Sequence, residues 1–132
     1  DVDLIEGLAV SQNFRLVIPV AEYYLKKPVA DKGDWFHTNL SRLTGEGLYY
    51  FLGYYSEYFV RLPEEGKAQA VFKLLSILQT NSKDYLRMGA FQALLGFAED
   101  PEVINMLGKA VEKEHSAELR NYFSYFLEML KE

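Results

Sequence analysis

Few side chains in this sequence could carry out metal or acid–base chemistry. The chain has two histidines and no cysteine, which excludes disulfides and thiolate metal sites. His37 and His115 are far too distant in sequence for the zinc-peptidase helix, which needs two histidines about four residues apart. His37 follows Trp35-Phe36, which favours a structural hydrogen bond, and His115 stands at a predicted helix end, which is typical of a solvated cap. We therefore expect no metal, cofactor-binding or catalytic residue in this chain.

Two pairs of adjacent carboxylates, Glu64-Glu65 and Glu99-Asp100, are the other candidates for acid–base chemistry. Both pairs stand at predicted helix starts, where acidic side chains interact favourably with the helix dipole, so capping explains them. No G-x-S-x-G elbow and no glycine-rich phosphate loop occurs in the sequence. A Ser-His-Asp site assembled from distant residues stays open. We expect that the chain alone is not an enzyme.

Phenol groups are unusually dense in residues 45–59, GEGLYYFLGYYSEYF, which hold five tyrosines and two phenylalanines. A helix over this stretch would collect an apolar core stripe, made of Leu48, Phe51, Leu52, Tyr55, Tyr58, Phe59 and Leu62. Its other face would carry Tyr49, Tyr50 and Tyr54 around Gly53, with Arg61 near the end. A surface helix normally has several charged residues there. This second face therefore needs cover, and these four tyrosine and arginine side chains are candidate partner contacts.

Four kinds of cover are open for that face. It could be other helices of the same domain, such as residues 12–26 with Tyr23 and Tyr24. It could be a further domain, or a ligand such as a sugar or peptide. Tyrosine suits a protein contact because it combines a large area with a polar tip. A membrane surface fits poorly, since interfacial helices carry several Lys and Arg on the polar side and this one has only Arg61.

The elements that must position these groups are helices. No stretch alternates over strand length, so the sequence predicts an all-α chain of seven or eight helices. Asp100-Pro101-Glu102 and Ser116 are predicted helix starts, as are Pro63 and Asp34, and Gly45 is a predicted helix stop. Pro19 should kink its helix or mark a restart. The predicted helices cover residues 2–9, 12–26, 35–44, 47–61, 64–79, 84–97, 101–113 and 117–131.

The second half of the chain contains a repeat. Leu86-Arg87 recurs 33 positions later as Leu119-Arg120, and the preceding helices follow the same shift. A two-helix hairpin cannot bury its apolar face alone, so consecutive hairpins must stack. Arg87 and Arg120 would then form a structural ladder of hydrogen bonds or ion pairs facing the loops of adjacent hairpins, with anion binding as the alternative. Residues 35–61 do not align with this repeat.

The repeat, with Asp84, Arg87, Ala90 and Ala93 leading its second helix, resembles HEAT-like repeats over residues 68–132. More loosely, the whole chain resembles the C-terminal helical domain of bacterial zinc aminopeptidases of the aminopeptidase-N type. This second resemblance rests on overall texture and on the start at Asp1, which suggests a segment cut from a longer protein. It implies a domain that follows and covers the catalytic one. The organisation expected is one domain, 1–132, with an irregular helical half (1–62) and two HEAT-like hairpins (63–132).

Composition limits the partners. The 132 residues carry a net charge of −5 and no basic block, so nucleic acid is a poor partner. No apolar run approaches the ~20 residues needed to span a bilayer, so we expect no membrane insertion. The compartment, periplasmic or cytoplasmic, stays open. We expect a non-catalytic structural and interaction domain that contacts another domain of its own polypeptide. The alternatives are an independent scaffold binding a protein or peptide and, third, a HEAT-like DNA-repair enzyme.

Overall fold

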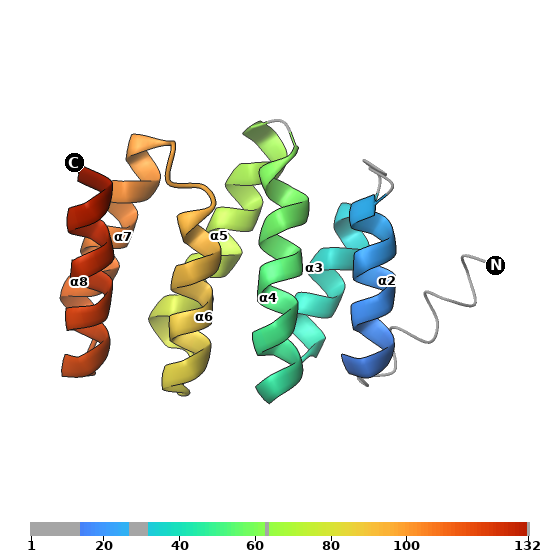
Figure 1. Cartoon of the computed structure of the whole chain (residues 1–132), viewed down its shortest axis with the longest axis horizontal. Coiled ribbons are helices and arrows are strands. Elements are labelled where there is room, and N and C mark those ends of the chain that lie inside the picture. Colours follow the sequence, from blue (N-terminus) through green and yellow to red (C-terminus); the bar gives the residue numbers. More distant parts are fainter. Residues whose placement is uncertain (1–13, 27–31, 63, 132) are drawn as a thin grey trace. The chain divides into compact units, whose positions relative to one another are not determined.

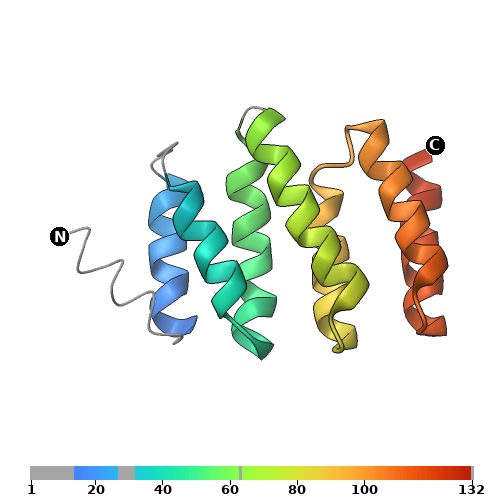
Figure 2. The ribbon, with the colours of Figure 1, turned by 180° about the vertical axis from the view of Figure 1, so that it is seen from behind.

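The computed structural model describes residues 14–26, 32–62 and 64–131, and within them every regular element is a helix (Figure 1; Figure 2 gives the reverse view). The all-α prediction is therefore confirmed. The predicted helix over residues 2–9 lies outside the described residues. The described helices are α2 (Phe14–Lys26), α3 (Gly33–Arg42), α4 (Gly45–Val60), α5 (Glu64–Thr80), α6 (Asp84–Leu95), α7 (Pro101–Lys113) and α8 (Ala117–Lys131).

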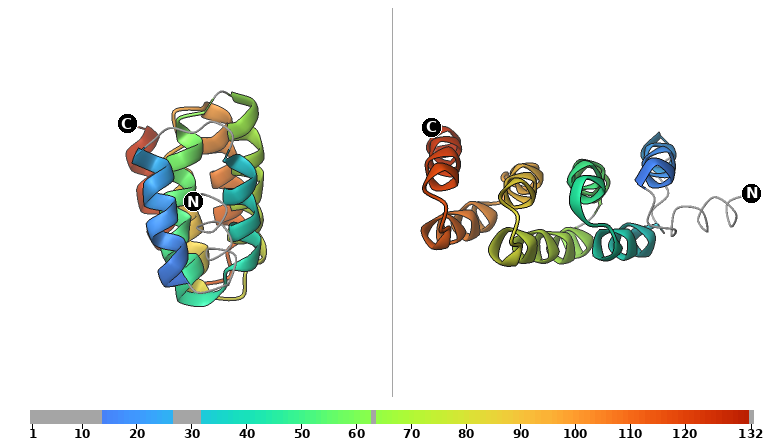
Figure 3. Two further views of the ribbon diagram at one scale, coloured as in Figure 1. Left: turned by 90° about the vertical axis from the view of Figure 1, so that its right-hand side faces the viewer. Right: turned by 90° about the horizontal axis from the view of Figure 1, so that it is seen from below.

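The chain divides into two compact units, Asp1–Ala70 and Val71–Glu132, called unit 1 and unit 2 below. The division falls within α5. In unit 1, α3 forms one layer, and α2 and α4 form the other (Figure 3). In unit 2, α6 and α8 share one layer, and α7 lies in the other together with the second part of α5 (Figure 3).

Helix ends follow local capping chemistry at two of the predicted starts. The Asp100 carboxylate accepts a hydrogen bond from the Glu102 backbone amide at 3.0 Å, directly before Pro101 opens α7. The Ser116 hydroxyl accepts one from the Leu119 amide at 3.3 Å at the start of α8. These side chains satisfy amides that the first turn of a helix leaves without partners.

The predictions for the two ends of α3 differ from the structure. The helix start predicted at Asp34 is about one residue late, because α3 begins at Gly33 and Asp34 lies in its first turn. Gly45 does not end one, because α3 stops at Arg42 and Leu43 is extended. Gly45 instead has a positive φ of 57° and opens α4. This left-handed geometry suits glycine, which lacks the Cβ that makes it costly.

Pro19 lies inside α2, which continues from Phe14 to Lys26 as one helix. The alternative of a helix restart near residue 19 is therefore excluded. Pro19 itself is exposed. Proline lacks an amide hydrogen, so the helix gives up one backbone hydrogen bond there.

Aromatic rings form the core of unit 1. Phe36 is fully buried and stacks on Tyr58 with ring centres 4.1 Å apart. Trp35 meets Tyr24 edge to face at 5.0 Å. Rings in these arrangements add to the stabilisation that their burial provides. The core stripe predicted for α4 is confirmed except for Leu62, which is only half-buried; the buried members are Leu48, Phe51, Leu52, Tyr55, Tyr58 and Phe59.

Aliphatic side chains form most of the core of unit 2, with one aromatic pair. Phe91 of α6 and Phe123 of α8 are fully buried and stacked at 4.2 Å. Phe123 takes the position that Ala90 holds 33 residues earlier, so the larger side chain of α8 fills space against α6. The fully buried leucines around this pair are Leu74, Leu94 and Leu107.

Candidate functional site

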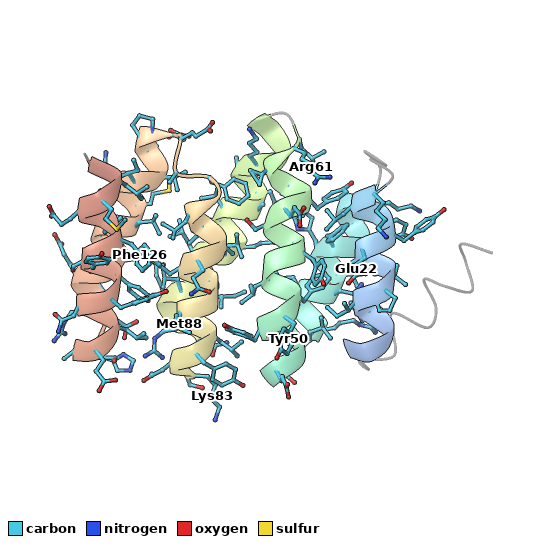
Figure 4. The ribbon with its side chains drawn as sticks, in the orientation of Figure 1. Glu22, Tyr50, Arg61, Lys83, Met88 and Phe126 are labelled. Atoms are coloured by element: carbon cyan, nitrogen blue, oxygen red, sulfur yellow. The ribbon has the colours of Figure 1, made fainter. Side chains whose placement is uncertain are left out.

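The second face of α4 is covered in part by α2. The Tyr54 hydroxyl donates to a Glu22 carboxylate oxygen at 3.0 Å. Arg61 donates to the Leu25 carbonyl at 2.9 Å and forms an ion pair with Glu57 at 3.1 Å (Glu22 and Arg61 are labelled in Figure 4). Burial and the hydrogen bond to Glu22 raise the pKa of Tyr54. For Tyr54 and Arg61, the cover is therefore another helix of the same chain, α2.

Tyr49 and Tyr50 form the rest of that face. Their rings are nearly perpendicular, with centres 5.6 Å apart. Tyr49 is half-buried, whereas the Tyr50 side chain is 50% exposed. Gly53 is exposed, and apart from the adjoining helix backbone no described atom lies within 4 Å of the position that a Cβ would take there. Of the four predicted contact residues, Tyr50 is thus the one whose ring is best placed to meet a partner.

His37 has a structural role in unit 1. The hydroxyl of fully buried Tyr55 lies 2.9 Å from His37 Nδ1, and the imidazole stacks on Phe59 at 4.6 Å. Burial raises the pKa of Tyr55, so the phenol stays neutral while its hydroxyl shares the hydrogen bond with Nδ1. The backbone amide of Lys32 donates to Tyr58 in the same region at 3.1 Å. Within residues 14–26, 32–62 and 64–131, no group of three or more His, Cys, Asp or Glu could hold a metal ion.

Among the charged side chains described in unit 2, Arg87 is the most deeply buried, with 2% of its surface exposed. Its Nε donates to Glu114 Oε1 at 2.8 Å, and its Nη2 donates to Glu114 Oε2 at 3.0 Å. Its Nη1 donates to the Asn81 carbonyl at 2.9 Å, and Asp84 accepts a further bond from Nη2. We call these four residues the Arg87 clasp. It ties the loop before α6 to the loop before α8.

Opposite charges stabilise each other in this clasp. Burial alone would raise the pKa of Glu114, but bonds from Arg87 and the Ser116 amide outweigh it, so the pKa lies below its ordinary value of 4.5. The hydrogen bond to Glu114 raises the pKa of Arg87, against the opposite effect of burial. His115, expected to be a solvated cap, is exposed and its Nε2 lies 3.3 Å from Arg87 Nη2. No residue next to Glu114 in the sequence indicates its burial.

Arg120 makes the bond that corresponds to one bond of Arg87. Arg87 donates to the carbonyl six residues before it at 2.9 Å, and Arg120 does the same to the Glu114 carbonyl at 2.8 Å. The loops also match, because Asn81 accepts from the Lys83 amide and Glu114 accepts from the Ser116 amide. Arg120 differs from Arg87 in being exposed, and no carboxylate pairs with it among the described residues.

Unit 2 also has a surface strip between α6 and α8, which we call the α6–α8 seam. It consists of Met88, Gln92 and Leu95 on α6 with Tyr122 and Phe126 on α8 (Met88 and Phe126 are labelled in Figure 4). Gln92 Nε2 donates to the Tyr122 hydroxyl at 2.8 Å, which brings the two helices together there. Gln92 is exposed and the other four are half-buried. The seam is therefore apolar with one polar pair at its centre.

No family model, curated protein or solved structure matches the chain. Among the described residues, no helix combines the length and the apolar character needed to cross a membrane.

Proposed function

We propose that the chain is a non-catalytic scaffold of HEAT-like helix hairpins that acts by packing against other polypeptide. One observation carries the proposal: Arg87 and Arg120, 33 positions apart, make the same bond to the carbonyl six residues before them. The equivalence extends to the loop amides bound by Asn81 and Glu114. Hairpins whose loops repeat in this way are built to stack on one another rather than to surround a reaction centre.

The burial pattern of α4 supports a third hairpin of the same kind. Residues 50–60 of α4 and 85–95 of α6 have the same order of buried and exposed side chains, except at 53 and 54 against 88 and 89. The shift is 35 positions rather than 33, and Leu52 stands where α6 has Arg87. The three hairpins would be α3–α4, α5–α6 and α7–α8.

Large apolar side chains on outward helix faces support the interaction role. A protein whose only task is to bury its own core has little need of them, although single exposed residues are common. They occur on six of the described helices, and aromatic residues and methionine, which are favoured at protein interfaces, predominate; the exposed residues are Tyr23, Tyr50, Phe72, Tyr85, Met106, Tyr125, Met129 and Leu130.

The parent enzyme in this proposal is a bacterial zinc aminopeptidase-like protein, and the scaffold would cover its catalytic domain. This part rests on the resemblance in texture alone. The reading frame upstream of Asp1 tests it. A His-Glu-x-x-His helix encoded there supports the parent, and its absence leaves the independent scaffold.

The non-catalytic role is tested with the purified chain. We expect no hydrolysis of aminoacyl substrates and no stoichiometric zinc by elemental analysis. Either activity or bound zinc contradicts the proposal. For the DNA-repair alternative, a gel shift at low salt is decisive, and we expect no shift because the chain carries a net charge of −5.

The partner contact is tested by mixing the chain with the remaining polypeptide encoded by its gene. We expect association that weakens when Tyr50 is changed to Ser. The matched control is Tyr125→Ser, which removes an exposed tyrosine of unit 2. Equal association of both variants would assign the contact elsewhere and favour the independent scaffold.

A further inference from the structure

The polar pair at the centre of the α6–α8 seam has hydrogen-bonding capacity left over. Gln92 uses one amide hydrogen on the Tyr122 hydroxyl, at 2.8 Å. Its carbonyl oxygen can accept, and the Tyr122 hydroxyl can still donate its own proton. No further bond of either side chain is found within the described residues. If the Gln92 amide is flipped so that its oxygen accepts from Tyr122, the Gln92 N–H group can still donate and the Tyr122 oxygen can still accept.

Such an adjacent donor and acceptor matches the backbone of one extended residue, whose own N–H and C=O point to the same side of the strand. A backbone N–H can donate to Gln92 while the carbonyl of the same extended strand accepts from Tyr122. Secondary structure inside a folded partner would already have used these backbone groups, whereas an extended segment has them free. The polar pair therefore favours a peptide over the face of another folded domain.

Apolar side chains flank the pair on both sides. Met88 and Leu95 lie about one helix turn before and after Gln92, and Phe126 follows Tyr122 by one turn. The Tyr122 and Phe126 rings are in edge contact at 4.9 Å. From Met88 to Leu95 the helix rises roughly 10 Å, which is the length of about three extended residues. Thioether and aromatic surfaces of this kind adapt to varied apolar side chains.

We propose that the α6–α8 seam binds an extended peptide segment with apolar side chains two positions apart. The N–H and the C=O of the residue between those side chains pair with Gln92 and Tyr122. One apolar side chain contacts Met88, and the other contacts Leu95 and Phe126. This inference rests on the proposed scaffold function and names its partner in unit 2.

The test uses the full chain, labelled with 15N, and the probe acetyl-Lys-Leu-Thr-Leu-Lys-amide. Amide NMR spectra are recorded as the peptide is added. We expect saturable shifts concentrated in α6 and α8. A probe methylated on the threonine backbone nitrogen lacks the N–H for Gln92, and we expect it to bind about 3- to 10-fold more weakly.

Two variants remove the protein groups that would bond to the peptide while keeping side chains of similar size. Gln92→Met and Tyr122→Phe should each weaken the unmethylated probe by about 3- to 10-fold. Both positions are at the surface, and unchanged far-ultraviolet circular dichroism checks that the variants fold. The control Tyr125→Phe, one turn away on α8, should leave binding unchanged.

Any of three results with the peptide overturns the inference: shifts outside α6 and α8, equal binding of the methylated probe, or no shifts at millimolar peptide. None of them bears on zinc content, hydrolysis or the Tyr50-dependent contact, so the scaffold proposal is judged separately. Concentration-dependent shifts at the seam without peptide would assign it to a second copy of the chain, and would also overturn the inference.

Discussion

Leu52 in unit 1 and Arg87 in unit 2 hold the same place in the burial pattern of their helices, yet one is apolar and the other charged. Leu52 is 1% exposed and Arg87 is 2% exposed. Leucine needs only neighbouring side chains to fill the space around it. Arginine must have its charge balanced and its N–H groups bonded. The Arg87 clasp meets this need with two carboxylates and a carbonyl, which fixes the loops around it.

In unit 1, three phenols make polar bonds between segments that are distant in sequence. Tyr54 reaches Glu22, Tyr55 reaches His37, and Tyr58 accepts from the Lys32 amide. A tyrosine brings a large apolar ring and one hydroxyl, so a single hydrogen bond satisfies it. Trp35 differs from these tyrosines: its indole nitrogen is buried and has no hydrogen-bond partner among the described residues. The comparison shows two ways to join helices: neutral hydroxyl groups on a ring core, and a buried ion pair between loops.

The largest expected effect comes from breaking the clasp. Arg87→Met leaves the buried Glu114 carboxylate without its cation, and removing one partner of a buried pair costs about 3–5 kcal/mol. We expect urea unfolding followed by methyl NMR to show unit 2 losing stability. Arg120→Met is the matched control, because Arg120 is exposed and its single bond is worth about 1 kcal/mol. Similar losses in both variants would contradict the special role of Arg87.

A smaller effect is expected in unit 1 from Tyr55→Phe. The change keeps the buried ring and removes the hydroxyl bonded to His37, so we expect a loss of about 1 kcal/mol in the free energy of unfolding. Fluorescence of Trp35, the chain's one tryptophan, follows unit 1 in the same urea experiment. Tyr54→Phe is the control, since its bond to Glu22 is exposed and should contribute less. A larger loss at Tyr54 would reverse the expected order.

The smallest effects should be gains, and they should be equal in the two units. Gly53 in α4 and Gly108 in α7 both have open space where a Cβ would be. Alanine at either position should raise the free energy of unfolding by about 0.5–1 kcal/mol, because glycine loses more conformational freedom in a helix. Calorimetry of each variant measures the gain. A loss at Gly53 but not at Gly108 would show a constraint on α4 that the described contacts do not contain.

The sequence was sufficient for features that depend on neighbouring residues. The helical class, the cap at Asp100 and the core stripe of α4 all follow from local pattern. The α3–α4 turn was mispredicted because glycine can end a helix or, with its positive φ, precede one. The Tyr54–Glu22 bond could not be predicted, since it joins residues 32 positions apart.

Burial of Glu114 was missed for a different reason. A glutamate beside histidine at a helix end usually faces water, and nothing local distinguishes this one. The available signal was the shift of 33 positions, which aligns Glu114 with Asn81 and so places it near an arginine. The similarity between the burial patterns of α4 and α6 could not be seen in the sequence. Equivalent positions are buried in both helices, but their residue types differ, as at Leu52 and Arg87.

The measurement that tests this comparison most directly is stability against pH, followed separately in each unit. The pKa of Glu114 in the folded chain lies below 4.5, so its stabilisation of unit 2 is complete above that pH and is lost as the pH falls further. Burial raises the pKa of Tyr55 above 10.0, so its stabilisation of unit 1 is complete below that pH and is lost as the pH rises.

Methyl NMR spectra in mild urea can follow leucine signals of both units from about pH 3 to about pH 11. Leu48 and Leu52 report on unit 1, and Leu74 and Leu94 report on unit 2. We predict that unit 2 unfolds first in acid and unit 1 unfolds first in alkali. Loss of both units together at each extreme, or the opposite order, would contradict the account.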